Sequence, residues 1–161
     1  MTILQSPLYR LYAKHMFIGL LIIALDQLTK LWAIRTLFGR DLITIASIIK
    51  LKLETNYGYA FSLFSNYGQS NQWLLVLASL PLVVVLSILL HRRMHALQNA
   101  IAETLVLAGG VSNLFDRIGR GMVIDFLGLQ FGKFNWPTTF NLADCSIVLG
   151  IMLLILRFIE E

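Results

Sequence analysis

Two aspartates, Asp125 and Asp144, are the residues of this sequence best suited to hydrolytic chemistry. Asp125 interrupts a short apolar segment, Met122–Phe126, and the nearest basic residue in the sequence is Arg120. Apolar surroundings raise the pKa of a carboxyl group, and a second carboxylate nearby separates the two pKa values further. One aspartate could then take a proton from an attacking water while the other donates a proton to the carbonyl oxygen or the leaving nitrogen. The residues alone rank an aspartyl hydrolase first and a transporter or channel close behind.

Other catalytic chemistries fit the sequence less well. Cys145 is the single cysteine, which excludes an internal disulfide. The three histidines are predicted at the membrane face opposite to the aspartates, which argues against a Cys/His site, a Ser-His-Asp triad and a zinc site. A Ser/Lys dyad built on Lys30 stays open, and it needs a serine placed by the fold, such as Ser62 or Ser112. We expect no cofactor, no metal and no nucleic-acid partner.

The composition indicates that lipid is the solvent of this chain. Of its 161 residues, 57% are apolar and 14% are charged, and the mean hydropathy is +0.73. Ordinary soluble domains are about 45–50% apolar, so too little polar surface remains here to face water. The length leaves room for a single domain, residues 1–161. Charged side chains inside a bilayer are expensive, so each one in a predicted span is a candidate functional residue.

Four apolar segments predict membrane helices, at about residues 15–37, 73–90, 96–115 and 141–159. The run Trp73–Leu90 carries no charge and covers about 27 Å as a helix, close to the hydrocarbon thickness of a bilayer. No small-x-small cleavage site follows the first segment, which we therefore interpret as a retained span and not as a cleaved signal peptide. Between the spans lie two long loops, at about residues 40–71 and 116–140.

A small sheet is predicted in the first loop. Apolar and charged residues alternate strictly over Ile49–Glu54, which is typical of a half-buried strand. Ile43 and Ile45 lie on either side of Thr44 and belong to its predicted partner strand. The expected fold class is an all-α integral membrane protein with four transmembrane helices and a small, cradle-like β-sheet on one membrane face.

The up-and-down order of the spans places most polar residues toward one membrane face. This set comprises Asp26, Lys30, Asn56, Asn113, Asp116, Arg117, Asp125, Asn141 and Asp144. The counts of lysine and arginine on the two sides do not decide the orientation. The one short turn, His91–His95, is basic, which favours both termini in the cytoplasm.

Several of these residues also have a purely structural interpretation. Asp26 and Lys30 are spaced i,i+4 and could neutralise one another, and Asp116 with Arg117 could be a solvated pair at a helix end. Asn141 suits a helix N-cap, which would put Asp144 at the third helical position, where a carboxylate stabilises the first turn. For Asp144 alone that role is favoured over catalysis. A structural role is harder to find for Asp125, because no basic residue lies nearer to it in the sequence than Arg120.

Five sequence blocks resemble the signature of the bacterial lipoprotein signal peptidases (signal peptidase II). They are Asp26-Gln27-x-x-Lys30, Asn56-x-Gly58-x-Ala60-Phe61-Ser62, Gly109-Gly110-x-x-Asn113-x-x-Asp116-Arg117, Gly121-x-Val123-x-Asp125-Phe126 and Phe140-Asn141-x-Ala143-Asp144. The blocks occur in the family's order and extend over nearly the whole chain. The resemblance implies an aspartyl endopeptidase of the bacterial inner membrane. Such an enzyme cleaves the signal peptide from diacylglyceryl-modified prolipoproteins immediately before the lipidated cysteine.

The resemblance also implies roles for individual residues. Asp125 and Asp144 match the family's catalytic pair. The residues that match its substrate-binding or site-shaping positions are Asp26, Lys30, Asn56, Gly58, Asn113, Asp116, Arg117, Asn141 and Ala143. Tyr57, Tyr59 and Cys145 depart from the residues common at their positions. We expect Asp144 to be rigid at a helix start, and Asp125 to lie on a loop that moves when substrate enters.

The same resemblance implies a setting for the protein. Both termini lie in the cytoplasm, and the active site and the small sheet lie toward the periplasm. The expected partners are prolipoprotein substrates and membrane phospholipids, and the protein is expected to be a monomer.

Overall fold

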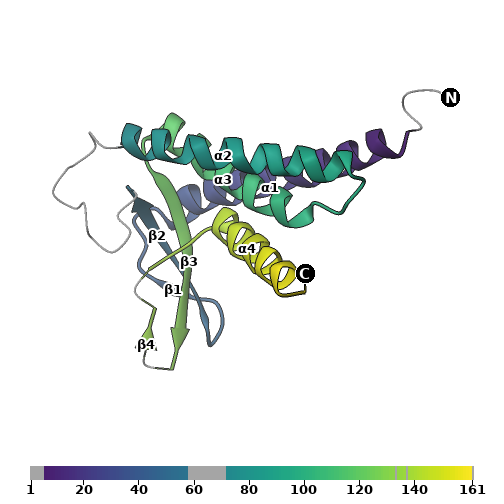
Figure 1. Ribbon diagram of the computed structural model, residues 1–161. Coiled ribbons are helices and arrows are strands. Elements are labelled where there is room, and N and C mark those ends of the chain that lie inside the picture. Colours follow the sequence, from purple (N-terminus) through teal and green to yellow (C-terminus); the bar gives the residue numbers. More distant parts are fainter. Residues whose placement is uncertain (1–5, 58–71, 133, 137, 161) are drawn as a thin grey trace.

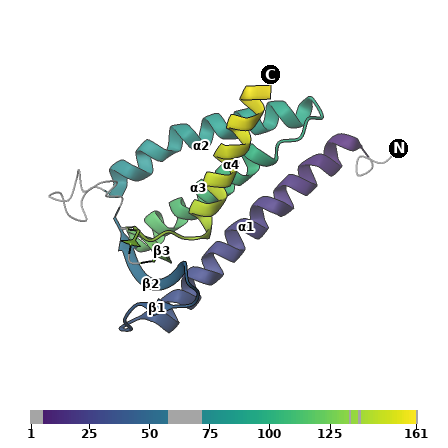
Figure 2. The same ribbon diagram turned by 90° about the horizontal axis from the view of Figure 1, so that it is seen from below.

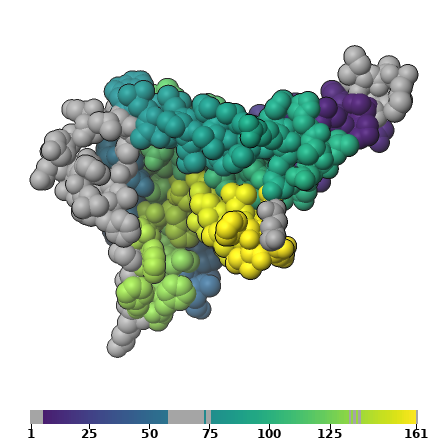
Figure 3. All heavy atoms as spheres, viewed as in Figure 1, coloured from purple at the N-terminus to yellow at the C-terminus, as the bar shows by residue number. Residues whose placement is uncertain are grey.

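The computed structural model describes residues 6–57, 72–132, 134–136 and 138–160. Three of the described helices run alongside one another with the fourth inclined to them, and a sheet projects from one end (Figure 1). The space-filling view in the same orientation shows the projecting part of the molecule below the helices (Figure 3). The elements are α1 (Pro7–Leu37), β1 (Ile43–Thr44), β2 (Ile49–Asn56), α2 (Gln72–His95), α3 (Ile101–Arg120), β3 (Val123–Phe131), β4 (Phe134–Asn135) and α4 (Leu142–Glu160). The prediction of a mainly helical membrane protein with a small sheet is confirmed.

Local capping signals set where the helices begin and end. α1 begins before the predicted span because Ser6 accepts a hydrogen bond from the backbone N–H of Tyr9, and Pro7 occupies the first turn. α2 continues through His91–His95, the segment predicted as a turn, because basic side chains favour the C-terminal end of a helix dipole. α3 ends at Gly121, whose φ of 76° gives the left-handed C-cap that glycine adopts without strain.

Three of the described helices are long and apolar enough to cross a membrane: α1, the Val76–His95 part of α2, and α4. The remaining helix, α3, carries Glu103, Asp116, Arg117 and Arg120. Its polar character has a structural reason, because α1, α2 and α4 all pack against α3, so its polar side chains face other helices. Figure 2 shows α1 and α2 on opposite sides of α3.

Polar and apolar residues are distributed as expected for a protein in lipid. Asp26, Lys30 and Asp116 are fully buried. By contrast, Phe17 and Leu77 expose 67% and 63% of their surface on the outside of the helices. An apolar outer surface around a polar interior is stable where hydrocarbon surrounds the protein.

Two glycines allow α3 and α4 to approach each other closely. A Cβ atom on Gly109 would lie 2.5 Å from the carbonyl oxygen of Ala143, and one on Gly150 would lie 2.6 Å from Cγ2 of Val106. Small residues at such positions let helix backbones come together in membranes. The contact of Gly109 with Ala143 places the first turn of α4 against the middle of α3.

We expect Gly109→Ala to destabilise the protein by about 1–3 kcal/mol, the usual cost of overpacking, because the backbone of α4 must move. Gly110→Ala is the matched control, since a Cβ atom there meets nothing within 4 Å. Alanine at position 110 should stabilise the helix by up to about 1 kcal/mol. Thermal unfolding of the two variants in detergent measures the difference, and equal melting temperatures would contradict the close packing.

The sheet is antiparallel with strand order β1-β2-β3-β4. The predicted strand Ile49–Glu54 and its partner at Ile43 are confirmed, with Ile43 opposite Leu51. A small core formed by Ala33, Leu37, Leu51 and Phe126 attaches the sheet to the end of α1. The register between β2 and β3 shifts between Leu51 and Glu54.

The expectation that Asp125 lies on a loop is wrong. Asp125 is in strand β3, directly opposite Glu54 of β2. Val123, Ile124, Asp125 and Phe126 are all buried, so the strand is covered on both faces and does not alternate. A short run without alternation gives no strand signal by periodicity. The sheet therefore holds the backbone of Asp125 in place.

Candidate functional site

One asparagine connects the two aspartates that the sequence analysis singled out. The side-chain Nδ2 of Asn141 donates a hydrogen bond to Oδ1 of Asp125 (2.7 Å), and its backbone N–H donates to Oδ2 of Asp144 (3.2 Å). Asp125 comes from β3 and Asp144 from the first turn of α4. The fold thus brings together two carboxylates from separate elements at the junction of sheet and helices.

Asp125 is almost completely buried, with 2% of its surface exposed. Burial, together with the nearby charge of Asp144, raises the pKa of Asp125 to about 6. Hydrogen bonds from Asn56 and Asn141 and the charge of Lys30 act in the opposite direction. Asn56, at the end of β2, donates from Nδ2 to Oδ2 of Asp125 (3.0 Å). Asp125 therefore exchanges its proton close to neutral pH, as a general acid or base needs to do.

Asp144 is held by a reciprocal cap at the start of α4. Its backbone N–H donates to Oδ1 of Asn141 (2.9 Å), and its own carboxylate accepts from the Asn141 backbone. This arrangement is a capping box, so the predicted structural role of both residues is confirmed. The second oxygen of Asp144 accepts from Nδ2 of Asn113 on α3 (2.8 Å). Three hydrogen bonds thus fix Asp144, and the capping role does not exclude a chemical one.

A fully buried lysine lies behind Asn113. The Nζ atom of Lys30 is 2.6 Å from Oδ2 of Asp26 and 2.7 Å from Oδ2 of Asp116. It also donates a hydrogen bond to Oδ1 of Asn113 (2.9 Å). The predicted i,i+4 pair of Asp26 and Lys30 is confirmed, but it is part of a larger network. Because Lys30 occupies the amide oxygen of Asn113, the amide NH2 group faces Asp144.

Asp26 connects the same network to the start of α4. Its Oδ1 accepts the backbone N–H of Ala143 (2.9 Å), and its Oδ2 accepts the hydroxyl of Ser112 (2.7 Å). A carboxylate at the N-terminus of a helix satisfies an unpaired N–H and interacts favourably with the helix dipole. Asp26 therefore anchors the turn that carries Asp144, and Ala143 contributes its backbone and not its side chain.

Asp116 and Arg117 do not form the solvated pair that their adjacency suggested. Asp116 is fully buried and pairs with Lys30 and with Arg120 one turn further along α3. The guanidinium of Arg117 donates to the backbone oxygen of Asn113 (3.5 Å), and its charge interacts with Asp144 and Asp125. The partners of Asp116 and Arg117 therefore depend on which side chains are buried together against α3, and not on which residues are adjacent in the sequence.

Three further residues belong to the polar network and were not predicted as site residues. The side chain of Gln27 donates to Ser112 and to Asp116. Arg120 donates to Oε1 of Gln27 (3.0 Å). The i,i+4 spacing of Asp116 and Arg120 is a usable sequence signal for Arg120, whereas the sequence suggests Ser112 only as a nucleophile.

The Ser/Lys dyad is not formed in this geometry. Nζ of Lys30 contacts Asp26, Asp116 and Asn113, and no contact with a serine hydroxyl is found among the described residues. The hydroxyl of Ser112 already donates to Asp26. Ser62 and the predicted site residue Gly58 lie outside the described residues. Within the described ranges, no three His, Cys, Asp or Glu side chains are grouped so that they could hold a metal ion.

Comparison with known proteins gives consistent similarities. The family model described as Signal peptidase (SPase) II matches residues 18–160. The lipoprotein signal peptidase of Francisella tularensis subsp. novicida (strain U112) is 34% identical over 144 residues, which cover 88% of this chain and 89% of the relative. The lipoprotein signal peptidase of Burkholderia mallei (strain SAVP1) is 34% identical over 143 residues, covering 89% and 86% respectively.

The fold is also similar to that of solved structures. One bacterial membrane enzyme superposes with a TM-score of 0.68 at 21% identity, covering 92% of this chain and 88% of the other. A second superposes with a TM-score of 0.71 at 22% identity, covering 92% and 94%. At these identities the two structures support the fold alone.

Proposed function

This chain belongs to the signal peptidase II family, and from that premise we propose that Asp125 and Asp144 are its catalytic pair. Membership makes the chain an aspartic peptidase that removes signal peptides from prolipoproteins, which sets aside the transporter alternative. The observation that carries the proposal is the contact of Asn141 with both carboxylates. A pair of carboxylates at one site can hold a proton on one member and a charge on the other.

The proposed reaction uses the two protonation states in turn. The ionised aspartate accepts a proton from water as the water oxygen attacks the scissile carbonyl, and the protonated aspartate donates to the carbonyl oxygen. In the second step the C–N bond breaks, the first aspartate gives its proton to the leaving nitrogen, and the second regains its own from the hydroxyl. Because the pair is coupled, it titrates as one unit. The raised pKa of Asp125 supports its role as the proton donor.

The surrounding residues support this chemistry by holding the pair in place. Asn113, Asn141 and Asn56 donate hydrogen bonds to the two carboxylates. The charge of Arg117 favours an ionised pair, and we propose that it stabilises negative charge during the reaction. Rigid donors placed before the substrate arrives are a general requirement for efficient catalysis.

We propose that the scissile bond is the one immediately before a diacylglyceryl-modified cysteine. A cysteine with two acyl chains is anchored at the membrane face, where the site lies between the helix ends and the sheet. The test uses the purified protein with a lipidated prolipoprotein peptide and identifies the products by mass spectrometry. The expected product begins with the lipidated cysteine, and the matched peptide without the lipid is expected to stay uncut. Cleavage at another bond, or equal cleavage of both peptides, contradicts this substrate assignment but not the catalytic pair.

We also propose the arrangement of this single peptidase domain in the bacterial inner membrane. All four helices, including α3, cross the bilayer of a monomer in contact with phospholipids. Both termini lie in the cytoplasm, while the site and the sheet lie at the periplasmic face. The support is that Glu103 pairs with Arg93 and Arg157, which joins the ends of α2 and α4 to the start of α3, away from the aspartates. This end carries the basic segment His91–His95, as cytoplasmic ends do.

The activity is expected to fall as pH rises through about 6, the pKa of Asp125, because the proton donor is then lost. The hydrogen bond from Asn56 stabilises the carboxylate and so lowers this pKa. Asn56→Leu should therefore move the alkaline limb of the kcat/KM profile to higher pH, whereas Thr55→Val on the same strand should leave it in place. A limb that stays fixed in Asn56→Leu would show that Asp125 is not the group that titrates.

A further inference from the structure

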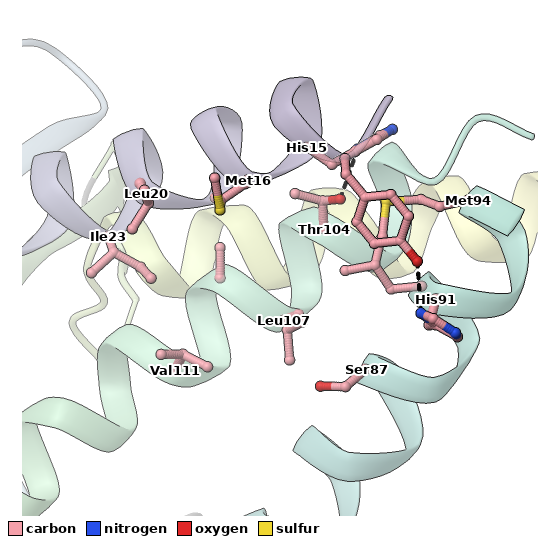
Figure 4. Close-up of a pocket in the computed structure, with 14 residues that line it drawn as sticks. His15, Met16, Leu20, Ile23, Ser87, His91, Met94, Thr104, Leu107 and Val111 are labelled. Carbon is pink, nitrogen blue, oxygen red and sulfur yellow. Dashed lines mark hydrogen bonds between the residues drawn. The ribbon is translucent and has the colours of Figure 1, made fainter. Parts of the chain in front are cut away.

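A cavity of about 440 Å³ lies between α1, α2 and α3, at the end of the helices away from the aspartates (Figure 4). Each of the three helices contributes one face to this cavity, and most of the lining is apolar. Its apolar side chains include Met16, Leu20, Ile23, Met94, Leu107 and Val111. We call this cavity the α1–α3 groove.

The groove is as long as one leaflet of a membrane. Along α1 its lining extends from Tyr12 to Ile23, a rise of about 16 Å at about 1.5 Å per residue. The hydrocarbon core of a bilayer is about 30 Å thick. In Figure 4, His91 lies at one end of the groove, and Ile23 and Val111 lie at the other. The groove therefore suits an occupant that enters from one membrane surface and ends near the bilayer centre.

The end near the helix termini is polar. A hydrogen bond of 2.6 Å joins Oη of Tyr12 to Nδ1 of His91. When the tyrosine donates this bond, the neutral imidazole carries its proton on Nε2 and becomes a donor itself. The ring of His95 lies 4.4 Å from that of His91, measured between centroids. Two imidazoles at the mouth of an apolar groove, one of them oriented by the phenol of Tyr12, can donate to a phosphate.

The exposed charges at these ends of α1 and α2 are mainly positive. Arg10, Lys14 and Arg92 are exposed in the first turns of α1 and the last turn of α2. The carboxylate of Glu103 is buried and already paired with Arg93 and Arg157, so it does not offset the exposed cations. Basic residues at a membrane surface attract anionic lipids.

We propose that the α1–α3 groove binds one acyl chain of an anionic phospholipid, whose phosphate lies at Tyr12, His91 and His95. The lipid comes from the leaflet on the side of the two termini. The groove does not suit the signal peptide of a substrate, because such a peptide carries a basic segment before its apolar helix. The cationic ends of α1 and α2 would repel that segment, and a helix that crosses the membrane needs the full bilayer thickness.

Native mass spectrometry of the full chain in an uncharged detergent tests the proposal, with phosphatidylglycerol and phosphatidylcholine as the two probes. The expected result is one retained phosphatidylglycerol, held several-fold more strongly than phosphatidylcholine. Equal retention of the two lipids overturns the proposal, since it indicates contact with the outer surface alone. This comparison uses the unchanged protein and does not depend on how any variant folds.

Variants then locate the bound lipid. Leu107→Trp fills the groove and should reduce retention of phosphatidylglycerol several-fold, and His91→Leu should reduce the preference for the anionic headgroup. Val85→Trp is the matched control, because Val85 is 52% exposed on α2 and does not line the groove. Equal retention in Leu107→Trp and Val85→Trp overturns the assignment. Cross-linking of a photoreactive side chain at position 107 to the signal peptide, and not to lipid, also overturns the assignment.

Discussion

Asp125→Asn and Asp144→Asn are each expected to abolish cleavage of a diacylglyceryl prolipoprotein while the protein still inserts and folds. Asparagine keeps the size of aspartate and an oxygen that accepts the hydrogen bonds from Asn141 or Asn113. It can neither take a proton from water nor donate a carboxyl proton. A single general acid or base contributes about 10²–10⁴-fold to a rate, and each aspartate serves in both steps, so the loss should reach the upper end of this range or exceed it.

The measurement is a time course of product formation by mass spectrometry, with melting temperatures in detergent to show that each variant is folded. Asp41→Asn is the matched control, because Asp41 is exposed and lies outside the polar network. It should cleave at the rate of the unchanged protein. Near-normal turnover in a folded Asp125 or Asp144 variant would refute the catalytic pair.

Lys30→Met is expected to destabilise the protein by about 3–5 kcal/mol, the usual cost of removing one partner from a buried ion pair. The substitution leaves Asp26 with a buried charge that no cation compensates, while Asp116 keeps Arg120. It also removes the hydrogen bond that orients the amide of Asn113 toward Asp144. Thermal unfolding in detergent and the cleavage assay report the two effects separately.

A second substitution separates the stabilising role of Lys30 from its effect on the site. In Asp26→Asn/Lys30→Met the uncompensated charge is gone, so we expect much of the stability to return. Activity should stay low, because the oxygen of Asn113 has lost the shorter of its two hydrogen bonds, from Lys30 (2.9 Å), and keeps only the one from Asn141 (3.2 Å). Arg35→Met on the same helix is the control for removing a cation, since Arg35 is exposed, and it should change stability by no more than about 0.5 kcal/mol. Recovery of activity together with stability would show that Lys30 acts through folding alone.

The sequence predicted the helices of the site well, because their signals are local. The apolar run of α4 is continuous in the sequence and its cap at Asn141 and Asp144 lies within one turn, and the structure has the predicted capping box. The pair Asp26 and Lys30 was found from its i,i+4 spacing alone. The position of Asp125 was harder to predict, because strand β3 is buried on both faces and carries no alternation.

The sequence by itself determined that the surroundings of this protein are lipid, that the protein is mainly helical, and that most polar residues in and beside its spans lie toward one membrane face. Those properties follow from the free-energy cost of placing charge in hydrocarbon, which affects the composition of every segment that lies in the membrane. Only the tertiary structure decided which charges are partners. Asp116 pairs with Lys30 and not with its neighbour Arg117, and Asn141 contacts both aspartates. Such contacts depend on how closely α3 and α4 approach at Gly109 and on the register of β2 with β3. A local sequence pattern does not encode the distance between residues that are far apart in the sequence.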